Sequence, residues 1–181
     1  METYISIIRG INVGGKNLIK MDSLRELYGN LGLKNINTFI QSGNVVFQTI
    51  ATHPEELEQL ISDTLLLQFS ANITVLVRKV SEFKNVLSQN PFFNEMNIDI
   101  TKLHITFLSM IPGKQFLESI EHVSYLPDKF LVIDRAIYLY CPTGYGNTML
   151  SNNFFEKKLE VRATTRNLNT LLEIIKICDL Y

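Results

Sequence analysis

The sequence predicts an α+β fold of two tandem ferredoxin-like units, each with the element order βαββαβ of an α-β plait, plus a C-terminal helix. Short segments in which apolar residues alternate or run together indicate strands, and longer segments with helical apolar spacing indicate helices. Clusters of turn-forming residues separate these segments. The order of elements before residue 80 recurs after residue 100, although no residue-level repeat accompanies it.

The first unit is expected at residues 1–80. Its strands are predicted at residues 4–8, 36–40, 45–49 and 73–78, with a hairpin turn at residues 41–44. The first helix is predicted at residues 22–31, where apolar residues share one face. The second helix begins within residues 52–55, because Thr52 and Glu55 match a capping box and Pro54 suits the first turn.

A linker helix and loop are expected at residues 81–100, with the helix at residues 81–89 and a break at Asn90-Pro91. The second unit is expected at residues 101–181. Its strands are predicted at residues 103–108, 130–133, 137–141 and 161–163, and its helices at residues 113–122 and 149–159. The C-terminal helix is predicted from the helical spacing of Leu168, Leu171, Leu172 and Ile175.

The composition is that of a globular protein, with 46% apolar and 19% charged residues. The formal net charge is −1, from 17 basic and 18 acidic residues, which argues against broad binding to nucleic acid or a membrane surface. No apolar run reaches the ~18 residues of a membrane span, and no signal-peptide pattern precedes Arg9. We therefore expect a cytoplasmic protein that does not bind membranes, with nucleic acid an unexpected partner.

The cysteines and histidines show neither a disulfide framework nor a metal-ligand pattern. Cys141 and Cys178 are far apart in apolar segments, so we expect buried, reduced thiols. His53, His104 and His122 are scattered without metal-ligand spacing. No motif identifies a metal or a cofactor.

The predicted topology brings polar loops together at two sheet edges. If the first strand of each unit runs upward, the first loop and the middle hairpin turn share the top edge. Residues 9–17 and 41–44 should therefore lie side by side in the first unit. In the second unit, residues 143–148 (TGYGNT) should neighbour residues 164–167 (TTRN) at the bottom edge.

The glycine-rich first loop resembles part of a phosphate-binding motif. Gly10, Gly15 and Lys16 match the start of a P-loop, but Asn17 stands where that motif requires the Mg²⁺-binding Ser or Thr. The strand order also lacks the alternating βα units of a nucleotide hydrolase. Two interpretations stay open: an anion site of another kind, or a purely structural loop.

At this first cluster we expect a small anionic ligand, phosphorylated compounds included. Arg9 and Lys16 would neutralise its charge, and the backbone N–H groups of Gly14 and Gly15 would contact its oxygens. The candidate ligand-binding residues here are Arg9, Asn12, Gly14, Gly15, Lys16, Asn17, Gln41, Ser42 and Asn44.

The second cluster adds Arg162, Arg166 and Asn167 as candidates. Arg166 is expected in the first turn of the last helix, where the helix dipole disfavours a cation unless an anion binds nearby. The alternative is that both arginines pair with protein carboxylates or point to solvent.

Tyr138 and Tyr140 are expected on the sheet face away from the helices. Aromatic residues there stack bases in RNA-recognition domains, but the basic glycine-rich motif of those domains is absent. The alternative is that the two rings bury this sheet face.

Four motifs together resemble a widespread bacterial family of proteins that carry a domain of unknown function. They are RGINVGGKN, TFIQSGNVVF, NPF at Pro91 and ATTRNLNT, and the resemblance covers nearly the whole chain. It implies a two-unit α-β plait, and it supplies no established activity, cofactor or catalytic residue. Two departures from the family pattern are Leu168, where members often have Trp, and Asn147, where many have a basic residue.

The expected function is thus the binding of a small anion by the first cluster, with no reaction assigned, because no general base or nucleophile stands out. The alternatives are a nucleic-acid-binding module that uses the sheet aromatics with Arg162 and Arg166, and a protein-interaction module with structural polar loops. The sequence does not indicate whether the protein is an enzyme, or its oligomeric state.

Overall fold

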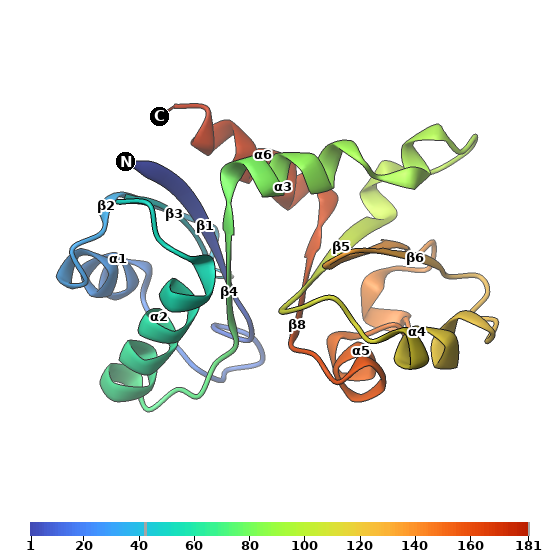
Figure 1. The fold of residues 1–181 in the computed structure, drawn as a ribbon, viewed down its shortest axis with the longest axis horizontal. Helices are drawn as coiled ribbons and strands as arrows, with labels where there is room; N and C mark the ends of the chain where they lie inside the picture. The colour runs from blue at the N-terminus through green and yellow to red at the C-terminus, as the bar shows by residue number, and fades with distance from the viewer. Residues whose placement is uncertain (42, 181) are drawn as a thin grey trace. The chain divides into compact units, whose positions relative to one another are not determined.

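The computed structural model describes residues 1–41 and 43–180, which form a mixed α+β structure with two four-stranded antiparallel sheets and helices α1–α6 (Figure 1). The chain divides into two compact units. The first comprises residues 1–85 and the segment from residue 173 onward, and the second comprises residues 86–172. The end of the last helix thus belongs to the first unit, whereas the sequence was divided with that helix wholly in the second.

The first unit follows the predicted order of elements. These are β1 (Glu2–Ile8), α1 (Met21–Asn30), β2 (Lys34–Phe39), β3 (Asn44–Thr49), α2 (Pro54–Phe69), β4 (Val75–Lys79) and the start of α3 (Val80–Ser88). The strand order across the sheet is β2-β3-β1-β4. Helices α1 and α2 cover one face of this sheet (Figure 1), and the apolar core lies between them.

The second unit repeats this plan. After the 3-10 turns η1 (Pro91–Asn94) and η2 (Ile100–Lys102) come β5 (Leu103–Leu108), α4 (Lys114–Glu121), β6 (Lys129–Ile133), β7 (Ala136–Tyr140), η3 (Tyr145–Asn147), α5 (Asn152–Leu159), β8 (Ala163–Asn167) and the start of α6 (Leu168–Cys178). The strand order is β6-β7-β5-β8. Residues 91–100 contain no strand, as predicted.

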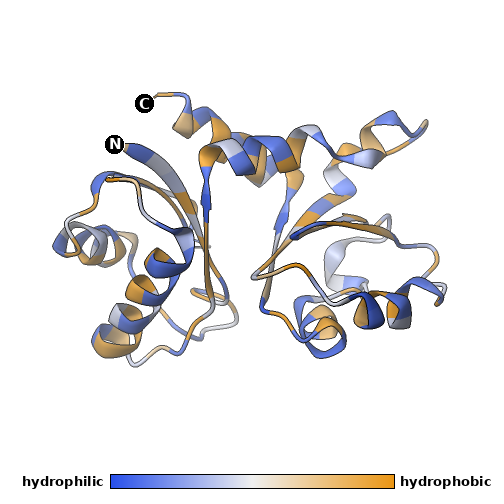
Figure 2. Cartoon of the chain, viewed as in Figure 1, coloured by the Kyte–Doolittle hydropathy of each residue, from blue (hydrophilic) through white to orange (hydrophobic). Residues whose placement is uncertain are grey.

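Each helix packs through an apolar stripe. Figure 2 shows hydrophilic and hydrophobic bands alternating along α2, and its buried residues include Leu57, Ile61 and Leu65 at helical spacing. These side chains pack against inward residues of the first sheet such as Tyr4 and Phe47. The apolar periodicity that predicted the helix is therefore the periodicity of its contact with the sheet.

Equivalent strands of the two sheets pair in the same register. Ile5 pairs with Val46 and Arg78 in the first sheet, and Ile105 pairs with Tyr138 and Arg166 in the second. The turns that follow these strands are also equivalent. The Ile8 N–H donates to the Gly43 carbonyl over 2.7 Å, and the Leu108 N–H donates to the Arg135 carbonyl over 2.9 Å. The repetition therefore lies in backbone pairing, where side-chain identity is not constrained.

Two local predictions are wrong. Residues 164–167 belong to β8 rather than to a loop and the start of a helix, because the β-branched Thr164 and Thr165 extend the pairing with β5. Arg166 is thus a strand residue, and α6 begins after Asn167, whose Oδ1 accepts the N–H of Asn169. A sequence window this short cannot separate a strand end from a helix start.

The capping box predicted at Thr52 is also absent. The residue at the N-cap position of α2 is His53 rather than Thr52. Its side chain makes no capping hydrogen bond among the described residues. The Tyr4 hydroxyl instead accepts the Thr52 N–H over 3.0 Å. This long-range bond occupies the N–H that the glutamate of a capping box would accept.

None of the helices in the described part of the chain is long and apolar enough to cross a bilayer.

Gly43 is required where β3 approaches the loop after β1. Its φ is +74°, and an added Cβ would lie 2.8 Å from atoms of both Ile8 and Ile11. We expect Gly43→Ala to lower the free energy of unfolding by about 2–4 kcal/mol through backbone strain and overpacking. Gly146→Ala, which meets open space, should change it by less than about 0.5 kcal/mol. Urea denaturation measures both, and equal losses would contradict the expectation.

Candidate functional site

The glycine-rich segment after β1 is a small hairpin. Val13 and Lys16 form an isolated antiparallel bridge, closed by a 3.1 Å bond from the Lys16 N–H to the Val13 carbonyl. Gly14 and Gly15 between them have φ of +59° and +73°, and positive φ at both central residues is what a type I′ turn requires. The two glycines therefore have a structural reason to be there. The hairpin tip, including Lys16, is exposed.

Asn12 joins this hairpin to the β2–β3 turn. Its Nδ2 donates to the Gln41 carbonyl over 3.0 Å and to the Ile19 carbonyl over 2.9 Å, and its Oδ1 accepts the Ile19 N–H over 2.9 Å. The prediction that the first loop and the β2–β3 turn lie side by side is confirmed. The Asn12 backbone has φ of +55°, which asparagine tolerates better than most residues.

A pocket of about 450 Å³ lies where these segments meet. Its lining residues come from the base of the hairpin, the start of α1 and the turn: Asn12, Leu18, Ile19, Lys20, Met21, Asp22 and Gln41. Of the candidates named from the sequence, Asn12 and Gln41 line it. Lys16 does not, and Lys20 is the lysine at the pocket.

The remaining candidates of the first cluster hold the backbone in place. The Asn17 amide donates to the Gly10 carbonyl over 3.1 Å. Asn44 is buried, and its amide donates to the Phe39 carbonyl over 3.3 Å, so it closes the β2–β3 hairpin. The Arg9 N–H donates to the Thr74 carbonyl over 2.9 Å. Ser42 lies outside the described residues.

The N-terminus of α1 opens onto the pocket, since Lys20, Met21 and Asp22 are its first residues. The first N–H groups of a helix have no intrahelical acceptor, and the positive end of the helix dipole lies there. Lys20 occupies the capping position without a side-chain capping bond among the described residues. Asp22 is ion-paired with Arg25. A poorly capped helix start beside a lysine favours an anion.

One feature of the sequence could have identified Lys20 as a residue of this pocket. Lys20 stands immediately before the first helix, at a position where Ser, Thr, Asp or Asn is the usual cap. A lysine there leaves the helix N–H groups without a side-chain acceptor and adds a positive charge.

In the second unit, the glycine-rich loop meets β8 as predicted. The Tyr145 hydroxyl donates to Thr165 Oγ1 over 3.0 Å, Thr165 donates to Asn152 Oδ1 over 2.7 Å, and the Thr106 hydroxyl lies 2.6 Å from Thr165 Oγ1. The His104 ring stacks on Tyr145, with centroids 5.0 Å apart. This network is satisfied by its own members, as expected of a structural cluster.

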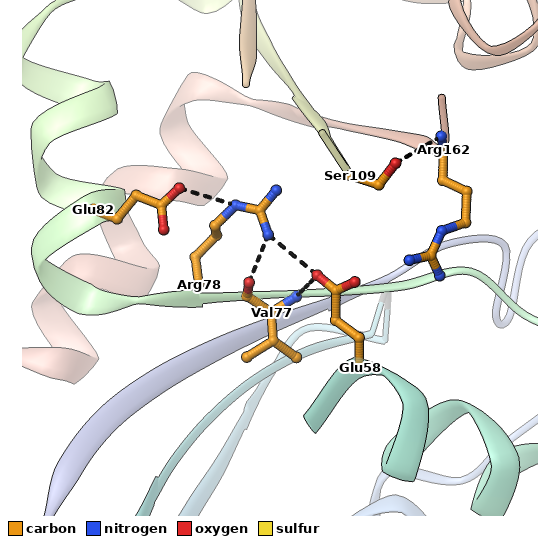
Figure 3. A network of polar contacts seen from close by, with 6 residues as sticks. All are labelled: Glu58, Val77, Arg78, Glu82, Ser109 and Arg162. Carbon is orange, nitrogen blue, oxygen red and sulfur yellow. Dashed lines mark hydrogen bonds and ion pairs between the residues drawn. The ribbon is translucent and has the colours of Figure 1, made fainter. Parts of the chain in front are cut away.

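The candidates of the second cluster lie on β8 and just before it, with Arg166 and Asn167 on opposite faces of the strand. The Arg166 guanidinium donates to the Thr165 carbonyl over 2.9 Å, and burial lowers its pKa to about 10. Asn167 lies next along the strand, so its side chain leaves from the opposite face, where it donates to the Thr101 carbonyl over 2.9 Å. Arg162 is exposed, and its N–H donates to Ser109 Oγ over 3.0 Å (Figure 3).

The aromatic residues proposed for base stacking pack inside the second unit. Tyr138 is 1% exposed, and its hydroxyl donates to the Val86 carbonyl over 2.9 Å. The Tyr140 ring lies 6.4 Å from the Phe92 ring, centroid to centroid. Tyr138 therefore has no open ring face for a base.

Neither cysteine is activated. Both are buried and unpaired by disulfides, and burial raises the pKa of Cys141 and of Cys178 to about 11. No group of three or more His, Cys, Asp or Glu side chains that could hold a metal ion occurs in the described part of the chain.

Comparison with known proteins places the chain in a family. The family model described as "Protein of unknown function (DUF1697)" matches residues 1–138, so the chain belongs to that family, and the resemblance inferred from the sequence is confirmed. No curated protein matches the sequence. The structure is similar to that of the conserved bacterial protein SP0830 from Streptococcus pneumoniae, with a TM-score of 0.76 and 21% identity over 97% of this chain and 98% of that one. At that identity the likeness concerns the fold alone.

His104 should make stability depend on pH. Burial lowers its pKa below the ordinary value of 6.5, so the unfolded chain takes up the proton at a higher pH than the folded chain. The free energy of unfolding should therefore fall as the pH drops below about 6.5, and the full contribution should be present above that pH. Urea denaturation between about pH 5 and 8 should show a shallower dependence for His104→Gln. Identical profiles for the two proteins would contradict this.

Proposed function

We propose that this DUF1697 protein binds a small anionic ligand, phosphorylated compounds included, in the pocket between the base of the 13–16 hairpin, Gln41 and the start of α1. One observation carries the proposal: the two loops that the sequence singled out meet at a pocket of about 450 Å³, and the pocket opens on a helix N-terminus beside Lys20. Ligand pockets for small molecules commonly have a volume of about 300–1,000 Å³.

The anion would sit against the first turn of α1. The N–H groups of Met21 and Asp22 supply donors that the helix itself leaves unpaired, and Lys20 supplies the nearest charge. Gln41 would orient the ligand from the opposite wall. Lys16 and Arg9 would add positive potential from further away, which affects the association rate and salt dependence more than the contact itself.

The pocket walls also favour a ligand with an apolar part. Leu18, Ile19 and Met21 line the pocket together with the polar residues. A bare inorganic ion would leave these walls in water, whereas an organic phosphate or carboxylate would cover them. The ligand class is thus an organic anion.

The proposal names binding and no reaction. The carboxylate in the lining set is that of Asp22, and it is already ion-paired with Arg25. A general base or nucleophile would need a group free to act on the ligand.

We further infer that each unit is ferredoxin-like. The element order βαββαβ and the strand orders β2-β3-β1-β4 and β6-β7-β5-β8 support this, because in each unit the first strand lies between the third and the fourth.

A thermal-shift screen at constant ionic strength tests the site. The probes are inorganic phosphate, nucleotides, sugar phosphates and small carboxylates. A ligand at a hundredfold excess over its Kd stabilises by about 2.7 kcal/mol, so a bound organic anion should raise the Tm of the wild-type protein by several degrees. Lys20→Ala should abolish this rise, and Lys16→Ala should reduce it only partly. Lys114→Ala, an exposed lysine of the second unit, is the matched control and should leave it unchanged.

None of these lysine variants should alter the Tm without ligand by much, since exposed lysines contribute little to stability. The proposal fails if no anion raises the wild-type Tm, or if Lys20→Ala and Lys114→Ala respond to the anion alike.

A further inference from the structure

Exposed aliphatic side chains surround the mouth of the pocket in the first unit. Leu18 lines the pocket and is 74% exposed, and Val13 and Ile40 are 62% and 50% exposed. Val13 directly follows Asn12 in the chain, and Ile40 directly precedes Gln41. Single exposed apolar side chains are common on protein surfaces, whereas a group of them around one pocket indicates a binding surface.

One hydrogen bond brings the two loops that carry these side chains together. The Asn12 amide donates to the Gln41 carbonyl over 3.0 Å, and both residues line the pocket. Neighbouring residues in a chain lie about 3.8 Å apart, Cα to Cα. Val13 and Ile40 therefore flank the same pocket, although they belong to different loops.

Ile40 has an unfavourable backbone conformation. Its φ is +49°, in the left-handed region that a β-branched residue rarely adopts. Among residues 1–41 and 43–180, the other non-glycine residues with positive φ are Asn, Ser, Asp or Glu. Because Ile40 is half exposed, packing in the core does not account for an isoleucine at this position. Strained residues of this kind occur at ligand-binding sites.

The sequence around these side chains is basic or uncharged. Residues 9–21 contain three basic residues and no Asp or Glu, and residues 35–44 contain no charged residue. Asp22, the carboxylate at the pocket, is ion-paired with Arg25. A partner that covers the aliphatic side chains also meets positive charge, so an anionic partner is complementary to this surface.

The apolar surface suits an aliphatic chain better than a ring. The apolar residues that line the pocket are Leu18, Ile19 and Met21, and the lining includes no aromatic residue in the described part of the chain. Proteins that bind bases commonly stack them on aromatic side chains. Flexible aliphatic side chains instead cover a flexible hydrocarbon chain through apolar area alone.

We propose that the organic anion of this pocket carries a hydrocarbon chain, an inference that rests on the function proposed above. The anionic head, a phosphate or a carboxylate, lies at the start of α1 beside Lys20. The chain leaves the pocket over Leu18 and lies against Val13 and Ile40. Covering these side chains stabilises the complex in proportion to the apolar area removed from water. The ligand class is an alkyl phosphate or a fatty acid.

Isothermal titration calorimetry with two series of probes tests the chain. The series are alkyl phosphates and alkanoates of increasing length, each kept below its micelle concentration. A fully buried CH₂ group contributes about 0.8 kcal/mol, which is about fourfold in Kd, and a partly covered one about twofold. The longest member, with about eight carbons, should therefore bind roughly a hundredfold more tightly than the one-carbon member in at least one series.

Two variants should flatten this dependence on chain length. Leu18→Ser and Ile40→Asn each remove aliphatic surface, so octyl phosphate or octanoate should lose about tenfold or more in affinity. Ile40→Asn should also raise the Tm without ligand by about 2–4 °C, because asparagine tolerates positive φ. A loss of binding in a stabilised variant is not a loss of fold. Leu66→Asn, at a leucine of α2 that is 48% exposed, is the matched control and should keep the wild-type dependence.

The head group is tested separately from the chain. Octanol has the chain without the charge and should bind at least about tenfold more weakly than the octyl anion, since the charge interacts with Lys20 and the helix start. Lys20→Ala should weaken binding of every anion in the series. An octyl anion that binds no more tightly than octanol, or equally well to Lys20→Ala, would show general adsorption and overturn the proposal.

The remaining outcomes separate this inference from the proposed function. If one-carbon and eight-carbon anions bind equally and Lys20→Ala weakens both, the anion site stands and the hydrocarbon chain is wrong. If no anion in either series binds, both proposals fail. Cosedimentation with anionic phospholipid vesicles should leave the protein in the supernatant. Capture by the vesicles without binding of the free amphiphiles would assign the surface to a membrane and overturn the inference.

Discussion

The side-chain amide of Asn12 holds the candidate site together. Its three hydrogen bonds join two segments of the first loop to the β2–β3 turn. Each such bond contributes only about 1 kcal/mol net, but an amide buried without partners would cost more. Ile11 and Ile19 anchor the two ends of the loop in the core. Between these anchors Val13 and Leu18 are exposed, so hydrogen bonds hold the loop, and those of Asn12 tie it to the β2–β3 turn.

This arrangement divides the glycine-rich segment into two parts with different roles. The tip, with Gly14 and Gly15, is a type I′-like hairpin whose glycines serve the turn. The base of the hairpin, with Asn12 and Lys20, forms the pocket wall. In the proposed site, the positive end of α1 and Lys20 would take the place that a phosphate-binding loop gives to its own backbone and lysine. The phosphate-loop pattern includes Lys16, whereas the lysine that lines the pocket is Lys20.

Much of the fold could be predicted from the sequence, because apolar periodicity records burial directly. The meeting of the first loop with Gln41 follows from strand order alone. The errors lie where a distant contact decides local structure. Thr164 and Thr165 become strand because β5 pairs with them, and the Thr52 N–H donates to the distant Tyr4 hydroxyl rather than to a local side chain. Lys20 lines the pocket because of the direction in which α1 points. A local sequence pattern does not predict that direction.

Native-state hydrogen exchange of the Ile19 amide in Asn12→Ala tests most directly whether Asn12 shapes the pocket. This buried N–H donates to Asn12 Oδ1 in the wild type. The Val77 amide, which donates to Glu58 in the same unit, reports any general loss of stability. We expect Asn12→Ala to speed exchange at Ile19 at least tenfold more than at Val77, which corresponds to about 1.4 kcal/mol of local opening. Equal changes at the two amides would show that the loop keeps its shape without Asn12.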